Sequence, residues 1–236
     1  MELEDFLPHG TLWVKDERGR MGLGSFKALG AAYVIASHAQ ELDENPCSTT
    51  LEGKTYVTAS AGNHGLSLAA GAKIFGAKAV VFISETVPES FSDRLREKGA
   101  VPVRKGIDYA ASMSAALKAA EENDWILLSD SSWKDYIDQP LKLMEGYLQM
   151  ADEAMNQSKS QASHVFLQAG VGGLAGAVAA HIRKIWGDTP LITVVEPSAA
   201  PALQKSIELG KPVLTEGPDS IMGRLDCKEP SFIALN

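Results

Sequence analysis

Short apolar segments alternate with longer amphipathic segments along most of the chain, and this alternation limits the possible folds more than any other feature. Segments such as 55–58 and 79–83 have the length of buried strands, and each precedes a segment with the apolar spacing of a helix. Strands that alternate with helices form parallel sheets covered by helices. The expected strands are 11–15, 55–58, 79–83, 101–104, 126–128, 164–168 and 191–195, and the expected helices are 26–40, 63–75, 88–98, 108–123, 140–155, 172–186 and 200–209.

The composition is that of a globular protein and argues against several kinds of partner. Hydrophobic residues make up 45% of the 236 residues, which is enough for a sizeable core. The formal net charge is −8, from 22 basic and 30 acidic residues, and this sign argues against a nucleic-acid or anionic-membrane surface. No apolar run approaches the roughly 20 residues that a membrane-spanning helix needs.

The cysteines, the histidines and the first residues bear on location and on metals. Cys47 and Cys227, the two cysteines, are far apart and imply no disulfide framework, which fits a reducing compartment. The five histidines show no spacing of metal ligands, so no metal site is expected. Residues 1–7 carry three acids and no basic cluster, unlike a signal peptide. We therefore expect a cytoplasmic protein.

A lysine ends the glycine-rich segment Gly22-Leu23-Gly24-Ser25-Phe26-Lys27, where a turn enters an expected helix. Most lysines are solvated and have no catalytic role. Lys27 is less usual because Phe26 and Ala28 flank it at the start of a largely apolar helix. Burial there predicts a lowered pKa and a nucleophilic amine.

Polar residues also follow two of the expected strands, as Ser60-Ala61-Gly62-Asn63-His64-Gly65 and as Asp130. Because ligands bind beyond the carboxyl ends of parallel strands, Asn63 and Asp130 indicate an amide and a proton-transfer carboxylate in one cleft. Each also has a purely structural interpretation. Ser60 and Asn63 are preferred residues for capping a helix, and Asp130 for a turn or cap. His64 is equally consistent with a buried structural histidine.

The glycine-rich segment Gly170-Val171-Gly172-Gly173-Leu174-Ala175-Gly176 lies between an expected strand and an expected helix. Glycines let backbone N–H groups approach an anion, and the following helix directs its positive end there, so the segment predicts a phosphate site. The same segment matches a dinucleotide-binding fingerprint, with Glu196 at the end of the next strand. A third interpretation is a tight turn with close packing of helix and sheet.

Together these segments resemble the fold-type II pyridoxal-phosphate (PLP) enzymes, the superfamily of the tryptophan synthase β chain and threonine dehydratase. Residues 15–30 resemble the part of that family that carries the cofactor lysine, residues 60–65 its ring-contacting loop, and residues 170–174 its phosphate loop. The order of the three segments and the intervals between them also resemble the family.

The resemblance implies an α/β fold of two open, mostly parallel, three-layer αβα domains with the PLP cleft between them. Residues 16–147 would form the smaller domain, with the cofactor lysine and the ring-contacting loop. Residues 1–15 and 148–236 would form the larger domain, with the phosphate loop, incomplete at its C-terminus.

The resemblance also implies roles for individual residues. Lys27 would bind PLP covalently, Asn63 would hydrogen-bond the ring oxygen, and Phe26 would pack against the ring. Lys27 or Asp130 would take the α-proton of an amino-acid substrate. The remaining assignments are phosphate binding by Gly170, Val171, Gly172, Gly173 and Leu174, and substrate binding by Ser60, Ala61 and Gly62.

Within the superfamily the chain most resembles the diaminopropionate ammonia-lyases, through residues 20–27, 130–136, 145–147 and 168–173. The implied activity is PLP-dependent α,β-elimination of 2,3-diaminopropionate by a homodimer in amino-acid catabolism, releasing ammonia and a keto acid such as pyruvate. Ala61 stands where ammonia-lyases usually have an aspartate, and in this it is more like the threonine and serine dehydratases. The chain is also short at both ends compared with the family.

Three kinds of function therefore stay open from the sequence. The first is a PLP-dependent ammonia-lyase or dehydratase acting on a small amino acid. The second is a dinucleotide-binding oxidoreductase, which accounts for residues 170–196 but assigns no role to Lys27 or Asn63. The third is a catalytically incomplete PLP-binding fragment, which the shortness of the chain suggests.

Overall fold

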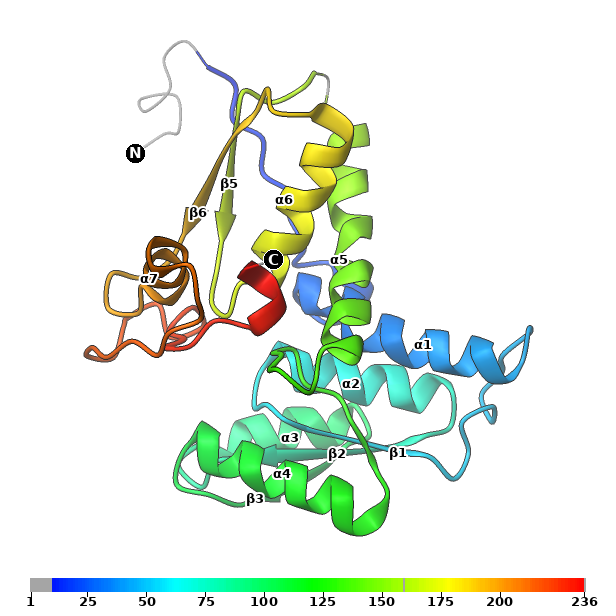
Figure 1. The fold of residues 1–236 in the computed structure, drawn as a ribbon. Coiled ribbons are helices and arrows are strands. Elements are labelled where there is room, and N and C mark those ends of the chain that lie inside the picture. The colour runs from blue at the N-terminus through cyan, green and yellow to red at the C-terminus, as the bar shows by residue number, and fades with distance from the viewer. Residues whose placement is uncertain (1–9, 159, 236) are drawn as a thin grey trace.

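The structure is a computed structural model that describes residues 10–158 and 160–235. The acidic start of the chain, residues 1–7, lies outside these ranges, as does residue 159 within a polar linker expected at 157–162. The described part contains two parallel sheets with their helices, and the long helix α5 (Asp138–Gln157) connects the first sheet to the second (Figure 1). Among the described helices, none combines the length and the apolar composition needed to cross a bilayer.

The first sheet has four parallel strands in the order β3-β2-β1-β4. The chain moves outward from β1 to β2 and β3, and then returns to place β4 on the other side of β1. This reversal of direction leaves a crevice outside the carboxyl ends of β1 and β4, which is where open α/β sheets bind ligands. The strands are β1 (Thr55–Ala59), β2 (Lys78–Ile83), β3 (Val101–Arg104) and β4 (Ile126–Leu127).

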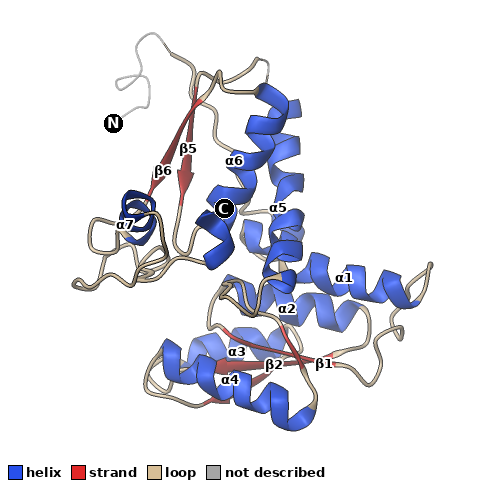
Figure 2. Cartoon of the chain, viewed as in Figure 1, coloured by secondary structure: helices blue, strands red, loops and turns tan. Residues whose placement is uncertain are grey.

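Helices cover both faces of the first sheet because its strands are apolar on both sides. Val57 and Phe82 point to one face, where they pack with Ala116 of α4 (Tyr109–Asn123). Tyr56 and Val81 point to the other face and join the larger core. The helices that cover this face are α1 (Ala31–Leu42) and α2 (Asn63–Ile74), with α3 (Glu89–Glu97) beside them (Figure 2).

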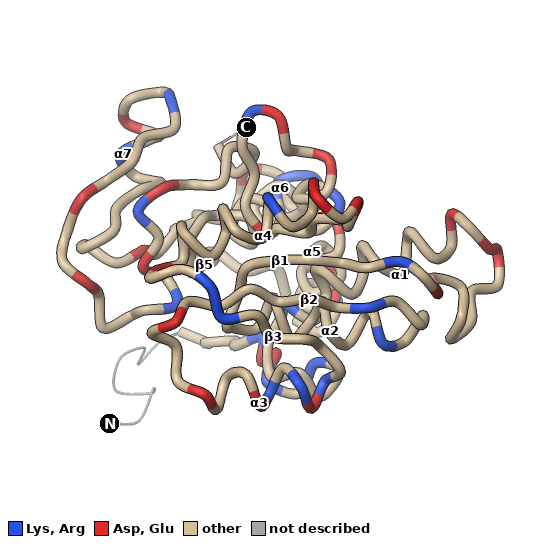
Figure 3. Tube along the Cα trace, turned by 90° about the horizontal axis from the view of Figure 1, so that it is seen from below, with Lys and Arg blue, Asp and Glu red and all other residues tan. Residues whose placement is uncertain are grey.

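The second sheet pairs two parallel strands, β5 (His164–Gln168) and β6 (Leu191–Val195). Val165, Leu167 and Ile192 pack into the same core as α6 (Gly173–Trp186). Helix α7 (Ala202–Leu209) follows β6, and a short 3₁₀ helix, Phe232–Leu235, packs against α6 and α7. Figure 3 shows Lys and Arg positions interspersed with Asp and Glu positions along the trace.

The parallel α/β fold that the alternation predicted is confirmed, and two local predictions are wrong. Residues 11–15 form no strand, and their mostly exposed side chains give that segment no sheet to join. The predicted helix 26–40 is instead a 3₁₀ helix, Phe26–Leu29, followed by α1. The break falls at Gly30, where an added methyl group would lie 3.0 Å from the Tyr147 side chain, so close packing against α5 fixes the change of direction.

Candidate active site

Lys27 lies on the 3₁₀ helix Phe26–Leu29, at the edge of the crevice that β1 and β4 define. Ser25 caps this helix, because its hydroxyl accepts a hydrogen bond from the Lys27 backbone N–H over 3.2 Å. The packing of α5 against the 3₁₀ helix holds the segment from the opposite side. The local fold therefore fixes the backbone of Lys27 and directs its side chain toward the first sheet.

The Lys27 ammonium donates to the Asp130 carboxylate over 2.7 Å. The structure thus brings together two predicted residues that are 103 positions apart. Burial alone lowers the pKa of the Lys27 ammonium, but the Asp130 carboxylate and then Tyr147 outweigh it, so the pKa is raised. Burial raises the pKa of Asp130, but the charge of Lys27 outweighs it, so the pKa lies below its usual range. The expectation that the pKa of Lys27 is lowered is therefore wrong, because a fixed carboxylate accompanies the burial.

Two aromatic rings enclose the ammonium. The nitrogen of Lys27 lies 5.3 Å from the centre of the Phe26 ring and 5.7 Å from that of Tyr147. The two rings meet edge to face, with centroids 5.1 Å apart. Tyr147 is buried, burial raises its pKa to about 12, and its hydroxyl has no hydrogen-bond partner among the described residues. Sequence reasoning assigned Tyr147 no role, although the spacing of Leu143, Tyr147 and Ala151 marks the buried face of α5.

His64 lies buried in the first turn of α2. Its Nε2 donates to the Leu128 carbonyl over 2.8 Å, which assigns the proton to that nitrogen. Nδ1 is buried without a partner among the described residues. Burial lowers the pKa of His64, so the ring stays neutral, and the charges of Asp130 and Lys27 act on it. A structural role for His64 thus accounts for Nε2, whereas Nδ1 has no structural partner among the described residues.

The loop from Ser60 to Asn63 follows β1 and leads into α2. The Ser60 hydroxyl accepts from the Gly62 N–H over 3.2 Å, and Ala61 packs against the core. Gly62 is the N-cap of α2, and no side chain caps this helix. Neither Ser60 nor Asn63 therefore acts as the cap that their residue types suggested. The first amide groups of α2 consequently have no capping side chain among the described residues.

The segment Gly170–Leu174 connects β5 to α6. Gly172 has a φ of +99°, a conformation that favours glycine, and no side chain caps α6 there. A methyl group on Gly172 would lie 2.8 Å from Leu203 and 2.9 Å from Ala234, so only glycine fits. Leu174 is a buried core residue, and only its backbone is free to meet a ligand. The segment is closely packed at Gly172, and no side chain caps the start of α6. Both the packing interpretation and the phosphate interpretation are therefore consistent with it.

Glu196 serves the fold in a way that the dinucleotide interpretation did not foresee. Its two carboxylate oxygens accept from the backbone N–H groups of Leu203 and Gln204, over 3.1 and 2.8 Å. These bonds satisfy the first turn of α7. A dinucleotide-binding protein would use an acid at this position to bind a ribose. In this chain the Glu196 carboxylate is instead bonded to the backbone of α7.

The segment 220–231 crosses from the second sheet to the first, and sequence reasoning assigned it no function. Ser231 bonds the Ser132 backbone N–H through its hydroxyl over 2.9 Å and the Val171 carbonyl through its own N–H over 2.8 Å. Cys227 lies against Gly170, where burial raises the pKa of its thiol and the charges of Asp130 and Lys27 act on it. The segment therefore joins the loops after β4 and β5.

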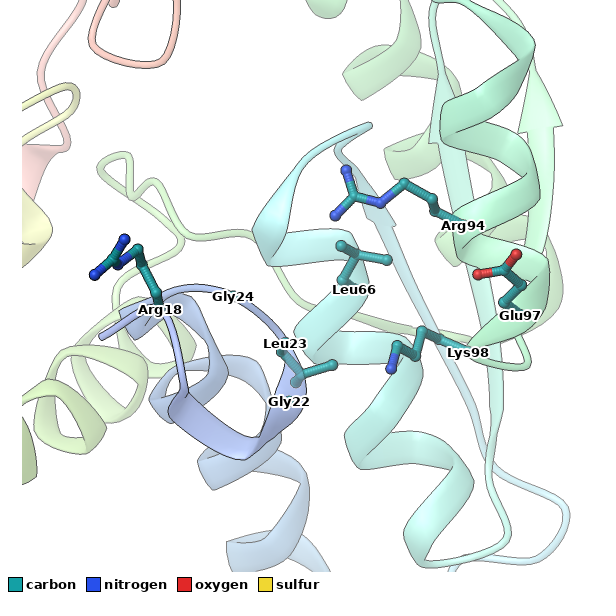
Figure 4. Close-up of a pocket in the computed structure, with 8 residues that line it drawn as sticks. All are labelled: Arg18, Gly22, Leu23, Gly24, Leu66, Arg94, Glu97 and Lys98. Atoms are coloured by element: carbon teal, nitrogen blue, oxygen red, sulfur yellow. The ribbon is translucent and has the colours of Figure 1, made fainter. Parts of the chain in front are cut away.

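A separate hollow of about 270 Å³ lies on the outer side of the turn that precedes Lys27 (Figure 4). Arg18, Arg94 and Lys98 contribute basic groups to it, and none of the predicted site residues lines it. The hollow is therefore distinct from the candidate site.

Comparison with known proteins identifies the class to which this fold and site belong. Residues 2–236 match the family described as pyridoxal-phosphate dependent enzyme, and the chain belongs to that family. A curated relative, the diaminopropionate ammonia-lyase of Salmonella typhimurium, is 32% identical over 246 residues, which cover 95% of this chain and 61% of the relative.

Solved structures agree with this assignment. The holo diaminopropionate ammonia lyase of Escherichia coli superposes with a TM-score of 0.88 at 30% identity, over 99% of this chain and 62% of that one. The same enzyme in complex with an aminoacrylate-PLP azomethine reaction intermediate gives a TM-score of 0.86 at 30% identity, over the same shares. The chain thus spans about three-fifths of the length of these proteins.

The residues of this chain fit the family's cofactor, pyridoxal phosphate. An amine is present at Lys27, and the buried Tyr147 hydroxyl and His64 Nδ1 near it have no partner among the described residues. The uncapped start of α6 at Gly172 offers the amide groups that a phosphate requires. The described structure therefore offers an amine, unpartnered buried polar atoms and an uncapped helix start, which fit the aldehyde and phosphate groups of the cofactor.

Proposed function

We propose that this protein uses PLP to eliminate the β-substituent of a small amino acid, with 2,3-diaminopropionate as its first substrate. The products are ammonia and a keto acid such as pyruvate. The observation that carries the proposal is the Lys27–Asp130 pair, 2.7 Å apart at the crevice of the first sheet. The 32% identity to a diaminopropionate ammonia-lyase supports the choice of substrate.

Residues of this chain would hold the reactive carbon, the ring oxygen, the ring face and the phosphate of the cofactor. Lys27 holds PLP covalently, Asn63 binds the ring oxygen and Phe26 packs against the ring. The backbone of the segment from Gly170 to Leu174 holds the phosphate, and the loop Ser60–Gly62 receives the substrate. The cofactor would then be held by residues of a smaller domain, 16–147, and of a larger one made of 1–15 and 148–236.

Lys27 and Asp130 carry out the proton transfers. When bound, PLP supplies an electron sink for the electrons left at the α-carbon of the amino acid. The free amine of Lys27 takes the α-proton, and the Asp130 carboxylate stabilises the ammonium that results. The same ammonium then donates a proton to the departing β-amine or β-hydroxyl. Phe26 and Tyr147 keep water away from the nitrogen during these steps.

A second candidate, a serine or threonine dehydratase, is favoured by Ala61. Its methyl side chain packs against the core and places no carboxylate in the substrate loop. A substrate with a β-ammonium group would benefit from an acid there, whereas a β-hydroxyl would not need one.

The proposal also includes a homodimer that acts in amino-acid catabolism in the cytoplasm. The family resemblance supports the dimer, and the free thiols of Cys47 and Cys227 support a reducing compartment. Sedimentation of the PLP-loaded protein tests the dimer, and fractionation of the source cells tests the location.

The test of the cofactor assignment is reduction of the PLP-loaded protein with borohydride, followed by peptide mapping. We expect the pyridoxyl group on Lys27, and none in Lys27→Ala. Lys134→Ala, which removes an exposed lysine near Asp130, is the matched control and should keep the label. Scattered labelling of surface lysines would refute the assignment of Lys27.

Turnover of diaminopropionate, serine and threonine is measured separately, with PLP-loaded protein that has not been treated with borohydride. Release of ammonia from diaminopropionate supports the first candidate, and release from serine or threonine alone supports the second. PLP bound at Lys27 without any turnover would identify a catalytically incomplete binding protein. Binding of a nicotinamide cofactor in place of PLP would favour an oxidoreductase.

A further inference from the structure

Arg224 lies against the loop that precedes α2. A methyl group placed on Gly62 would lie 2.9 Å from Nη1 of Arg224 and 3.7 Å from its Cζ. The guanidinium thus fills the space that a side chain at Gly62 would occupy. Arg224 belongs to the segment that crosses from the second sheet, so two residues far apart in the sequence meet here.

The Arg224 guanidinium has no carboxylate partner among the described residues, unlike Arg20, Arg96 and Arg104, which pair with acids. It rests instead on the Phe91 ring, with its Cζ 5.6 Å from the ring centre. Stacking of this kind holds the plane of a guanidinium and leaves its N–H groups free. The side chain remains exposed, so an incoming molecule can reach it.

The backbone that carries Arg224 is held in place on both sides. Its carbonyl oxygen would lie 3.4 Å from a methyl group on Gly170, beside the phosphate loop. Asp226 accepts from the Ser220 backbone N–H over 2.8 Å and pairs with Lys228 over 2.7 Å. Arg224 therefore projects from a braced turn rather than from a free loop.

The contact between Arg224 and the start of α2 is positively charged. Gly62 is the uncapped N-terminal position of α2, and the start of a helix carries partial positive charge. Arg224 adds a full positive charge to it, and no acid compensates among the described residues. Nearby, the charges of Lys27 and Asp130 cancel within their pair, and they act on both His64 and Cys227. The contact thus carries a net positive charge in the loop that follows β1.

We propose that the Arg224 guanidinium pairs with the α-carboxylate of the amino-acid substrate beside Gly62. This inference rests on the proposed function and adds a residue that decides specificity within it. The Ser60 hydroxyl and the first amides of α2 complete the carboxylate site. An amino acid is held by its carboxylate at Arg224, so substrates that lack this group are discriminated against.

The experiment uses the PLP-loaded protein and compares alanine with alaninamide, which differ only in the carboxylate. Alanine has no leaving group on its β-carbon, so calorimetry measures its binding without elimination. Arg224→Gln should weaken alanine binding about 10- to 100-fold, the range of a lost hydrogen bond to a charged group. Binding of alaninamide should change less than about threefold, because the missing group is already absent from the ligand.

Three further measurements make the result specific. Arg96→Gln removes an exposed arginine of α3 and should leave both affinities unchanged. Phe91→Leu removes the stacking surface and should weaken alanine binding by a smaller factor than Arg224→Gln does. Titration with PLP should give the same affinity for the wild type and Arg224→Gln, and a selective loss of PLP affinity would assign Arg224 to the phosphate and overturn the inference.

The failure of this inference differs from the failure of the proposed function. If Arg224→Gln binds alanine as the wild type does while diaminopropionate is still turned over, only the role of Arg224 is refuted. If the wild type eliminates nothing but alanine binding depends on Arg224 as described, the carboxylate site is supported and the proposed reaction is refuted.

Discussion

The Lys27–Asp130 pair sets the chemical state of the amine before any ligand binds. Burial by itself favours the neutral amine, and the carboxylate 2.7 Å away favours the ammonium. The carboxylate prevails, so the pKa of Lys27 is raised and that of Asp130 is lowered. The pair therefore stays ionised from mild acid, above the ordinary pKa of an aspartate, through neutral pH.

Asp130→Asn should make Lys27 more reactive in the protein without PLP. Loss of the carboxylate leaves burial as the main influence, so the pKa of Lys27 falls and more of the amine is neutral at pH 8. A fall of one pKa unit gives about tenfold more neutral amine, and we expect at least that increase in labelling. Brief acetylation followed by peptide mass spectrometry measures it, with the exposed lysines as internal references.

The control for this prediction is Asp135→Asn, which neutralises an exposed aspartate in the same loop. It should leave the labelling of Lys27 unchanged. If Asp130→Asn slows the labelling of Lys27, the carboxylate is not what keeps the amine protonated.

Lys27 could be proposed from the sequence because it lies where a glycine-rich turn enters an expected apolar helix, and Asp130 because it follows an expected strand. Their contact could not, since it depends on the return of β4 to the side of β1. The pKa of Lys27 is raised because of that contact, so its direction could not be predicted without the contact. Arg224 carries even less local signal, because its significance lies in its contact with Gly62.

At the scale of elements, the alternation of strands and helices was read correctly wherever an element packs on a sheet. The errors fall at the 3₁₀ helix before α1, where packing against α5 decides the backbone, and at residues 11–15, which have no sheet to join. Gly30 ends the 3₁₀ helix because Tyr147 of α5 leaves no room for a side chain. Local propensity does not contain that information.

The crossing of α5 over the Lys27 segment depends on Gly146. A methyl group there would lie 2.0 Å from the backbone oxygen of Leu29 and 3.0 Å from Tyr33. Gly146→Ala should therefore push the 3₁₀ helix away from α5, at a cost of about 1–3 kcal/mol in the free energy of unfolding. Thermal unfolding measures the loss, and covalent PLP loading at Lys27 should fall with it.

Gly176→Ala is the matched control, because it also adds a methyl group inside a helix. The nearest atom is the flexible end of Met144, 3.4 Å away. Alanine should be neutral or stabilising there, since it favours the helix by up to about 1 kcal/mol over glycine. Equal stability and equal loading of the two variants would show that the α5 crossing tolerates a side chain.

At the scale of the whole molecule, the second sheet has helices on one face and exposed apolar side chains on the other. The strand register places Phe166, Leu191 and Val195 on the face away from α6, and they are 64%, 59% and 41% exposed. Parallel sheets normally have both faces covered. An open apolar face of this kind favours association with another surface.

Phe166→Lys should reduce self-association of the described chain. A charged side chain at the centre of the open face raises the cost of covering it, whereas the exposed position keeps the change in folding stability within about 0.5 kcal/mol. Sedimentation velocity over a range of protein concentrations measures the association, and PLP labelling of Lys27 should be unchanged. Ile107→Lys, at an isolated exposed residue, is the control and should associate like the wild type. If Phe166→Lys associates as strongly as the wild type, the contact lies elsewhere and the sheet face is not what drives it.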